Sequence, residues 1–159
     1  MPLTIALNSN HINSLDLSPA LAAIEPLLKA GAIDTQEQQI QFQINFPREP
    51  EDPRELSEIP EIRLWFIRLD SLYPWFPFLL DWKTGELARY TAMLVPHQFH
   101  SKEGIQYNPE ALEIFVMHKI FVMTTWLQNQ GIEGRARLKS MAQMFGYELD
   151  DGLFDVLSK

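Results

Sequence analysis

The sequence contains no cysteine in its 159 residues. Disulfides, thiolate zinc sites and Cys-ligated iron–sulfur clusters are therefore excluded, and with them much redox and metal chemistry. The absence suits a reducing compartment. The N-terminal residues show neither a basic segment followed by a long apolar one nor an Arg-rich amphipathic leader. We therefore expect an unprocessed cytoplasmic protein.

Basic residues are scarce as well. The 13 Lys and Arg stand against 21 Asp and Glu, so the net charge is −8. Such a chain repels phosphate backbones over most of its surface, which argues against general nucleic-acid binding. Binding to a membrane surface is the least favoured alternative, because anionic lipids attract basic patches.

Long apolar runs are also missing. The most apolar stretch, residues 111–127, is interrupted by Glu113, His118 and Lys119 and by two threonines. A membrane-spanning helix needs an uninterrupted apolar run of about 18 residues. This stretch therefore predicts a core helix, and we expect no stable membrane insertion.

The chain lacks the GxGxxG, Walker, HExxH and GxSxG motifs, by which phosphate-binding loops, zinc proteases and nucleophile elbows can be recognised. We expect a protein that binds another protein rather than an enzyme, with no cofactor. A scattered acid pair leaves no motif, however, and Asp70 and Asp81 flank an aromatic segment. Single acids at strand ends are usually solvated turn residues.

A hydrophobic fraction of 46% predicts one folded domain over residues 1–159. Alternating residues predict strands at Leu3–Leu7 and at 40–46. Between them, Ser18 and Pro19 indicate the start of a helix that ends near Gly31.

Residues 47–61 are expected to form an exposed acidic loop with at most one short helical turn. The segment holds four prolines, six acidic residues and two arginines, for a net charge of −4. Prolines cannot join a strand ladder, and acids do not bury apolar area.

The middle of the chain predicts further strands. Residues 62–69 alternate in a strand-like way with both faces apolar, and Lys83-Thr84-Gly85 separates two apolar runs at 76–81 and 86–95, as in a hairpin. The expected fold is α+β, with a mainly antiparallel sheet packed against a long helix in the C-terminal half and shorter helices.

Three helical segments are predicted after this sheet. Asn108-Pro109-Glu110 combines an N-cap, a first-turn proline and a first-turn acid, and the helix that it begins runs to Gln130 with Gly131 as its stop. A second helix is expected at 134–145, and an acidic amphipathic turn at 150–157.

Two groups of residues are candidates for partner binding. The first is a dense aromatic segment, because Trp and Tyr dominate protein interfaces, although burial in the core explains each of these residues at least as well. The second is the one basic helix face, which would suit an acidic client or be merely solvated. The candidates are Trp65, Tyr73, Trp75, Trp82, Arg135, Arg137 and Lys139.

Histidines provide an alternative polar site. His97 and His100 form the only histidine pair, and a metal reading would recruit a nearby carboxylate such as Glu86, but Pro96 places the pair at a strand end where the side chains need not converge. His118 lies among apolar residues of the long helix and could transfer protons, although a hydrogen-bonded core histidine is the commoner case. A small enzyme or metal-dependent hydrolase using these three histidines is therefore the alternative function.

The segment Ile62–Leu127, through the words PWFPFLLDW, MLVPHQFH and NPEALEIFVMHK, resembles the chlororespiratory reduction 6 family of small soluble proteins from cyanobacteria and chloroplasts. The resemblance implies an assembly factor or chaperone of the photosynthetic NAD(P)H dehydrogenase-like (NDH) complex. Its client would be the ferredoxin-like peripheral subunit that carries iron–sulfur clusters. It also implies a cyanobacterial cytoplasm, with relatives in the chloroplast stroma, and no catalytic residues.

Overall fold

The computed structural model describes residues 3–30 and 39–157. The chain divides into two compact units, Met1–Leu94 and Val95–Lys159, and each is described by itself. A single domain over residues 1–159 stays a prediction.

The first unit contains a parallel sheet of two strands, β1 (Leu3–Asn8) and β2 (Ile40–Asn45). Leu3 pairs with Ile40, and Asn8 pairs with Asn45. Because side chains alternate across a strand, Ile5 and Leu7 of β1 are buried while Thr4 and Ala6 are exposed. Both strands that the alternation predicts are confirmed.

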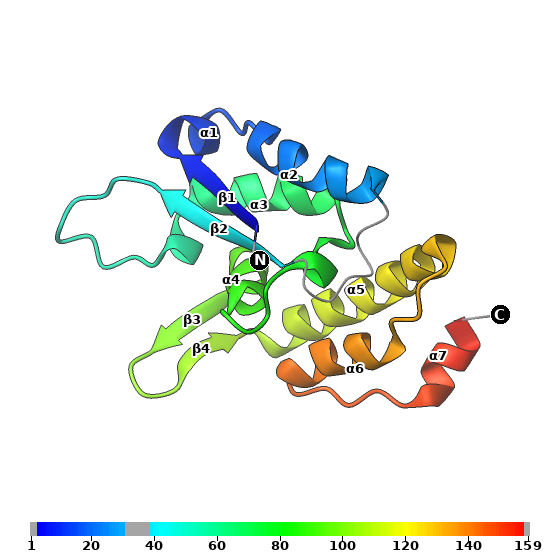
Figure 1. The fold of residues 1–159 in the computed structure, drawn as a ribbon. Coiled ribbons are helices and arrows are strands. Elements are labelled where there is room, and N and C mark those ends of the chain that lie inside the picture. The colour runs from blue at the N-terminus through cyan, green and yellow to red at the C-terminus, as the bar shows by residue number, and fades with distance from the viewer. Residues whose placement is uncertain (1–2, 31–38, 158–159) are drawn as a thin grey trace. The chain divides into compact units, whose positions relative to one another are not determined.

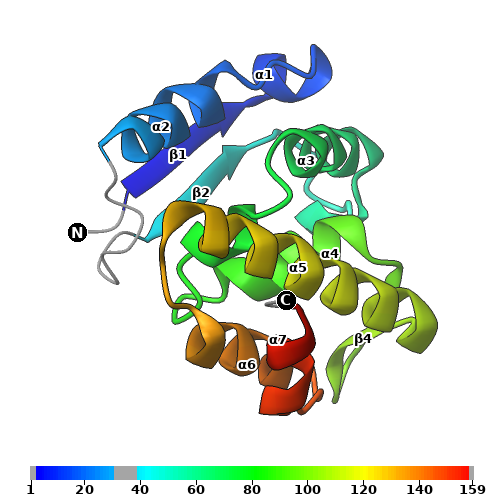
Figure 2. The ribbon, with the colours of Figure 1, turned by 90° about the vertical axis from the view of Figure 1, so that its right-hand side faces the viewer.

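Helices α1 (Ser9–Asn13) and α2 (Ser18–Lys29) follow β1 and contact it (Figures 1 and 2). The helix predicted to begin at Ser18 is confirmed, with Pro19 in its first turn. Its predicted end at Gly31 lies outside the described residues.

The strand predicted at 62–69 is wrong, because this segment belongs to helix α3 (Pro60–Leu72). Pro60 stands in the first turn, where proline favours a helix start, and Glu61 follows where the helix dipole favours an acid. The buried residues are Ile62, Trp65, Phe66 and Leu69, which share one helical face. The apparent alternation arose because most of the segment is apolar, so a two-residue period fits it by chance.

The predicted hairpin around Lys83-Thr84-Gly85 is wrong too. The first apolar run forms a short 3₁₀ helix, η3 (Phe76–Leu79), and the second forms helix α4 (Glu86–Leu94). Gly85 has φ of 84°, a left-handed conformation that glycine adopts without strain, and α4 begins immediately after it. The turn residues therefore lead into a helix rather than between two strands.

The α+β class is confirmed, but the expected mainly antiparallel sheet is not. The described residues are mainly helical and contain two separate two-stranded sheets, one parallel and one antiparallel. Between β2 and α3, the acidic segment has neither helix nor strand from Pro47 to Glu55 and then forms the 3₁₀ turn η2 (Leu56–Glu58).

The second unit begins with an antiparallel hairpin, β3 (His97–His100) and β4 (Gly104–Tyr107). Helix α5 (Pro109–Gln130) follows, and both of its predicted ends are confirmed. The Asn108 side chain accepts the Ala111 amide hydrogen at 3.0 Å, and Gly131 ends the helix in a left-handed conformation with φ of 71°.

Helices α6 (Arg135–Met144) and α7 (Asp151–Leu157) complete the second unit, close to their predicted bounds. Both contact α5, and Figures 1 and 2 show α7 beside α6. Within residues 3–30 and 39–157, no helix is long and apolar enough to cross a membrane.

Candidate partner-binding site

Trp65 is a core residue in this structure. Its side chain is completely buried on the inner face of α3, and its indole Nε1–H donates to the Asp16 carbonyl at 2.8 Å. The ring packs edge-on against Phe42 and Phe66, with centroids 6.0 and 5.0 Å away. Because its surface and its polar atom are both occupied internally, Trp65 offers nothing to a partner in this conformation.

The other three aromatic candidates follow α3, and two of them reach the surface. Tyr73 is buried and packs against Trp75, with ring centroids 5.2 Å apart. Trp75 and Trp82 are partly exposed, and the Trp82 indole donates to the Pro77 carbonyl at 2.9 Å. A partly exposed indole that is held by a hydrogen bond, as in Trp82, loses little side-chain entropy on binding.

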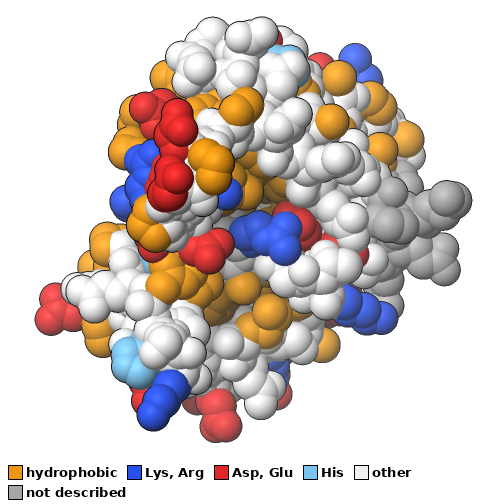
Figure 3. Space-filling model, turned by 90° about the vertical axis from the view of Figure 1, so that its left-hand side faces the viewer, with side chains coloured by type: hydrophobic (Ala, Val, Ile, Leu, Met, Phe, Trp, Pro, Cys, Tyr) orange, Lys and Arg blue, Asp and Glu red, His pale blue; other side chains and the backbone are white. Residues whose placement is uncertain are grey.

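The strand prediction for 62–69 concealed a group of exposed apolar residues. Leu64 and Ile67 on the outer face of α3 are 52% and 44% exposed, and Leu72, the last residue of the helix, is 50% exposed. A helical period applied to the same residues would have placed Leu64 and Ile67 away from the buried face, with Leu72 at the end of the helix next to it. Figure 3 shows hydrophobic side chains among acidic and basic ones on one face of the molecule.

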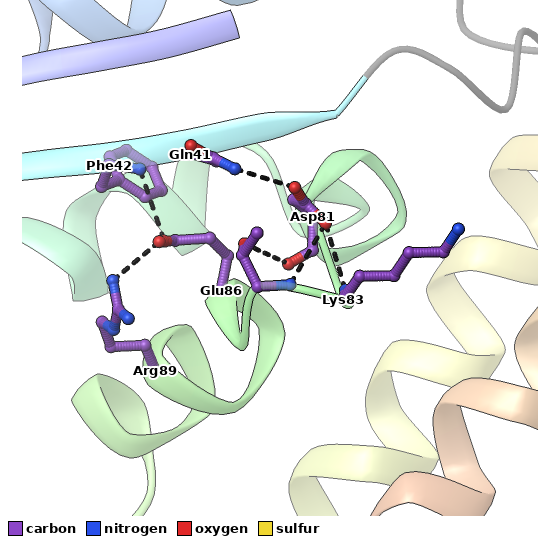
Figure 4. Close-up of polar contacts among 7 residues, drawn as sticks. Gln41, Phe42, Asp81, Lys83, Glu86 and Arg89 are labelled. Carbon is purple, nitrogen blue, oxygen red and sulfur yellow. Dashed lines mark hydrogen bonds and ion pairs between the residues drawn. The ribbon is translucent and has the colours of Figure 1, made fainter. Parts of the chain in front are cut away.

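Two buried carboxylates lie close to β2 (Figure 4). Asp81 is 3% exposed, and its Oδ1 accepts the backbone hydrogens of Lys83 and Thr84 at 3.1 and 3.3 Å. Its Oδ2 accepts the Gln41 side-chain amide at 2.8 Å. Asp81 thus shapes the turn that leads into α4 and ties this turn to β2.

Glu86, at the start of α4, is 4% exposed. Its Oε1 forms an ion pair with Arg89 at 2.7 Å, and its Oε2 accepts the Phe42 amide hydrogen at 3.4 Å. Burial raises the pKa of the Glu86 carboxyl, and the nearby Asp81 acts in the same direction, while Arg89 and the Phe42 amide oppose the rise. Both acids are bound to donors of the protein itself, which indicates a structural role.

Asp70, which the sequence suggested as a partner for Asp81 in an acid pair, lies on α3. It accepts the hydroxyl hydrogen of Tyr90, a fully buried residue of α4. Burial, with Asp70 contributing, raises the pKa of the Tyr90 phenol well above its usual value. This contact joins α3 to α4.

His97 and His100 do not converge. They are three positions apart on β3, so their side chains leave opposite faces of the strand. His97 Nδ1 lies 2.9 Å from the Val95 carbonyl, and its ring packs edge-on against Phe99 and Tyr107. His100 Nδ1 accepts the Lys102 amide hydrogen at 3.2 Å. Each imidazole therefore has a local structural contact.

His118 is exposed on α5. Within residues 3–30 and 39–157, no group of three or more His, Asp or Glu side chains could hold a metal ion. The geometry of the described residues therefore gives no support to a hydrolase built on the three histidines.

The basic candidates lie on α6, and two of them have acidic partners on α7. Arg135 lies 3.6 Å from Asp151 and 3.1 Å from Asp155, and Lys139 lies 2.6 Å from Asp151. The Lys139 hydrogen bond holds the pKa of Asp151 below its usual value. Asp151 and Asp155 follow the basic helix in the sequence, but their ion pairs with it were not predicted.

Arg137, the third basic candidate, is partly buried, and this burial lowers the pKa of its guanidinium. The basic face of α6 is therefore largely engaged by the protein itself, and a partner would have to compete for it.

Comparison with known proteins gives one family. A family model described as chlororespiratory reduction 6 matches residues 7–156, which is nearly the whole chain. No solved structure matches the chain significantly.

Proposed function

The chain belongs to the chlororespiratory reduction 6 family, and from this membership we propose that it is a non-catalytic assembly factor of the photosynthetic NDH complex. The observation that carries the proposal is the family match, which covers residues 7–156. The proposed client is the ferredoxin-like peripheral iron–sulfur subunit of this complex.

The composition limits how such a factor would act. Without cysteine the chain has no thiolate to hold an iron–sulfur cluster, so it would act on its client by surface contact and not as a thiolate scaffold. A cytoplasmic location belongs to the proposal, because a cysteine-free chain suits a reducing compartment.

We place the client contact on the exposed apolar residues of α3, Leu64, Ile67 and Leu72, and on the partly exposed indoles of Trp75 and Trp82. These three aliphatic side chains are about half exposed, whereas Trp65 on the inner face is fully buried. Exposed aliphatic residues and partly exposed indoles are both typical of protein interaction sites. An apolar surface also suits a subunit that exposes apolar area before it is assembled.

The proposal is tested by affinity isolation of the tagged chain from native cells, with mass spectrometry of the NDH subunits. The Leu64→Ser, Ile67→Ser, Leu72→Ser variant should recover the peripheral iron–sulfur subunit at least tenfold less well than the wild type. The matched control is Ile114→Ser with Phe121→Ser, two exposed apolar residues of α5. It should recover the subunit normally.

Three results would contradict parts of the proposal. If the wild type recovers no NDH subunit, the assembly function is wrong. If the α3 variant recovers the iron–sulfur subunit as well as the wild type, the contact lies elsewhere. If only the α5 variant loses the subunit, the contact surface is on α5 and not on α3.

A further inference from the structure

The C-terminal helix α7 is short and weakly anchored. It has seven residues, and Phe154 is its only fully buried side chain. An isolated helix of two turns is not stable in water, because it has too few hydrogen bonds to offset the cost of nucleation. Helix α7 therefore depends on its contacts with α5 and α6.

Electrostatic contacts supply part of this anchoring. Asp151 contacts both Arg135 and Lys139, and Asp155 contacts Arg135. Both aspartates are about two-thirds exposed, at 64% and 65%, so water and salt screen these pairs. The charges set where α7 lies but add little to its stability.

The apolar part of the anchoring of α7 comes from Phe154. It is 2% exposed and lies under the Arg135 guanidinium, 5.4 Å from the ring centroid. Beside it is a pocket of about 90 Å³ whose lining includes Leu127 and Leu138. The seat of α7 is thus a depression lined both by apolar residues, among them Leu127, Leu138 and Phe154, and by polar ones, among them Gln128, Glu133 and Arg135. Lys139 reaches Asp151 of α7 at 2.6 Å.

The connection to α6 allows α7 to leave without unfolding its neighbours. Helix α6 ends before Gly146, which has φ of 88°, and residues 147–150 form neither helix nor strand. Local opening of weakly packed terminal elements is the expected low-energy motion of a folded protein.

We propose that α7 is an internal occupant of a docking site for an acidic, helix-forming segment of the client, which binds by displacing α7. The site recognises an aromatic or aliphatic anchor in the depression and carboxylates beside Arg135 and Lys139, because α7 presents this chemistry there. This inference deepens the proposed function and depends on it for the existence of a protein client.

Because a client segment must displace α7, it binds only if its affinity is high enough to compete with α7. A tethered segment competes at an effective concentration of about millimolar, so a free segment with the same contacts is excluded until it exceeds that concentration. A client that also contacts a second surface of the protein gains the additional affinity needed to replace α7. Helix α7 thus keeps the site closed to unrelated acidic peptides.

The test uses the full chain carrying Asp151→Asn, Phe154→Ala and Asp155→Asn, which weakens every contact of α7 described above. The probe is a fluorescent peptide of the wild-type sequence 149–157. The opened variant should bind this peptide at least tenfold more tightly than the wild type does, and the binding should weaken as salt rises. Adding Arg135→Glu and Lys139→Glu to the opened variant should abolish the binding.

Equal and negligible peptide binding by the wild type and a folded opened variant overturns the inference. Should the opened variant not fold, hydrogen exchange of the wild type decides. Amides of 151–157 should exchange at least tenfold faster than those of 135–144, and equal protection means that α7 is not displaceable.

Client capture separates this inference from the proposed function. If the opened variant binds the peptide but neither protein recovers the iron–sulfur subunit, α7 is displaceable but the proposed client is wrong. If the subunit is recovered and the peptide is not bound in trans, the proposed function stands and the α7 inference is wrong.

Discussion

The backbone amide of Phe42 donates its hydrogen to the Glu86 carboxylate, with 3.4 Å between nitrogen and oxygen. Phe42 lies on β2, which pairs with β1 along one edge. On the other edge, the Ile40 carbonyl accepts the Asp81 amide hydrogen at 3.1 Å, and Ile40 forms a single bridge with Leu80. A buried side chain and one bridge thus supply partners for β2 where a larger sheet would have a further strand.

Replacing Glu86 with Gln should change how stability depends on pH. Burial raises the pKa of Glu86 above its usual 4.5, so between the unfolded and folded pKa values the folded protein holds more protons. The contribution of Glu86 to the free energy of unfolding is therefore fully present below the unfolded pKa and is lost as pH rises through the folded pKa. Urea unfolding between pH 4 and pH 7 should show the wild type losing stability relative to the Gln variant as pH rises. A difference that is independent of pH would show that the carboxyl is not perturbed by burial.

Ile120→Ala should destabilise the protein by about 2–5 kcal/mol, because this side chain is fully buried on α5 and its truncation leaves a cavity. Ile114→Ala is the matched control, since the same residue type on the same helix is 71% exposed. It should change the free energy of unfolding by no more than about 0.5 kcal/mol. Denaturant unfolding followed by circular dichroism measures both. Similar values for the two variants would mean that the buried face of α5 is misassigned.

Tyr107 should lose its phenolic proton at a higher pH than an exposed tyrosine does. Burial raises its pKa from 10.0 to about 12, so the folded protein retains a proton that the unfolded chain has lost. Its contribution to stability is therefore present below pH 10.0 and declines as pH rises to about 12. Ultraviolet titration of the wild type minus that of Tyr107→Phe should have its midpoint near the upper value. A midpoint near the usual pKa would show that the phenol is solvated.

The acidic segment between β2 and α3 should be the first internal site of proteolysis. Glu51 and Glu55 are exposed in a stretch that has no helix or strand, so a protease can bind this backbone without unfolding it. A glutamate-specific protease in brief digestion, followed by mass spectrometry, should cut at these residues before Glu113. Glu113 is equally a surface glutamate but lies within α5. Earlier cutting at Glu113 would contradict the prediction, because it would show that helix α5 opens to the protease more readily than the acidic segment does.

Local signals predicted some elements well. Asn108 and Gly131 mark the two ends of α5, because an N-cap and a left-handed glycine act through the backbone of one turn. The alternation around Phe42 predicted β2 in the same way. Segment 62–69 was misread because its residues are nearly all apolar, and a pattern without contrast does not distinguish a period of two from one of 3.6.

The partner-binding candidates show the same division. The composition and the missing catalytic motifs indicated protein binding, and the sequence segments shared with the family indicated the family. Both inferences needed only the amino-acid sequence. Which aromatic residues are exposed depended on neighbours distant in sequence: Trp65 is covered because Asp16 and Phe42 lie against it. The sequence by itself thus determined composition, caps and strand alternation, since these depend on single residues or adjacent ones. Only the tertiary structure decided that Arg135 faces Asp155, because burial and charge pairing depend on which segments the fold brings together.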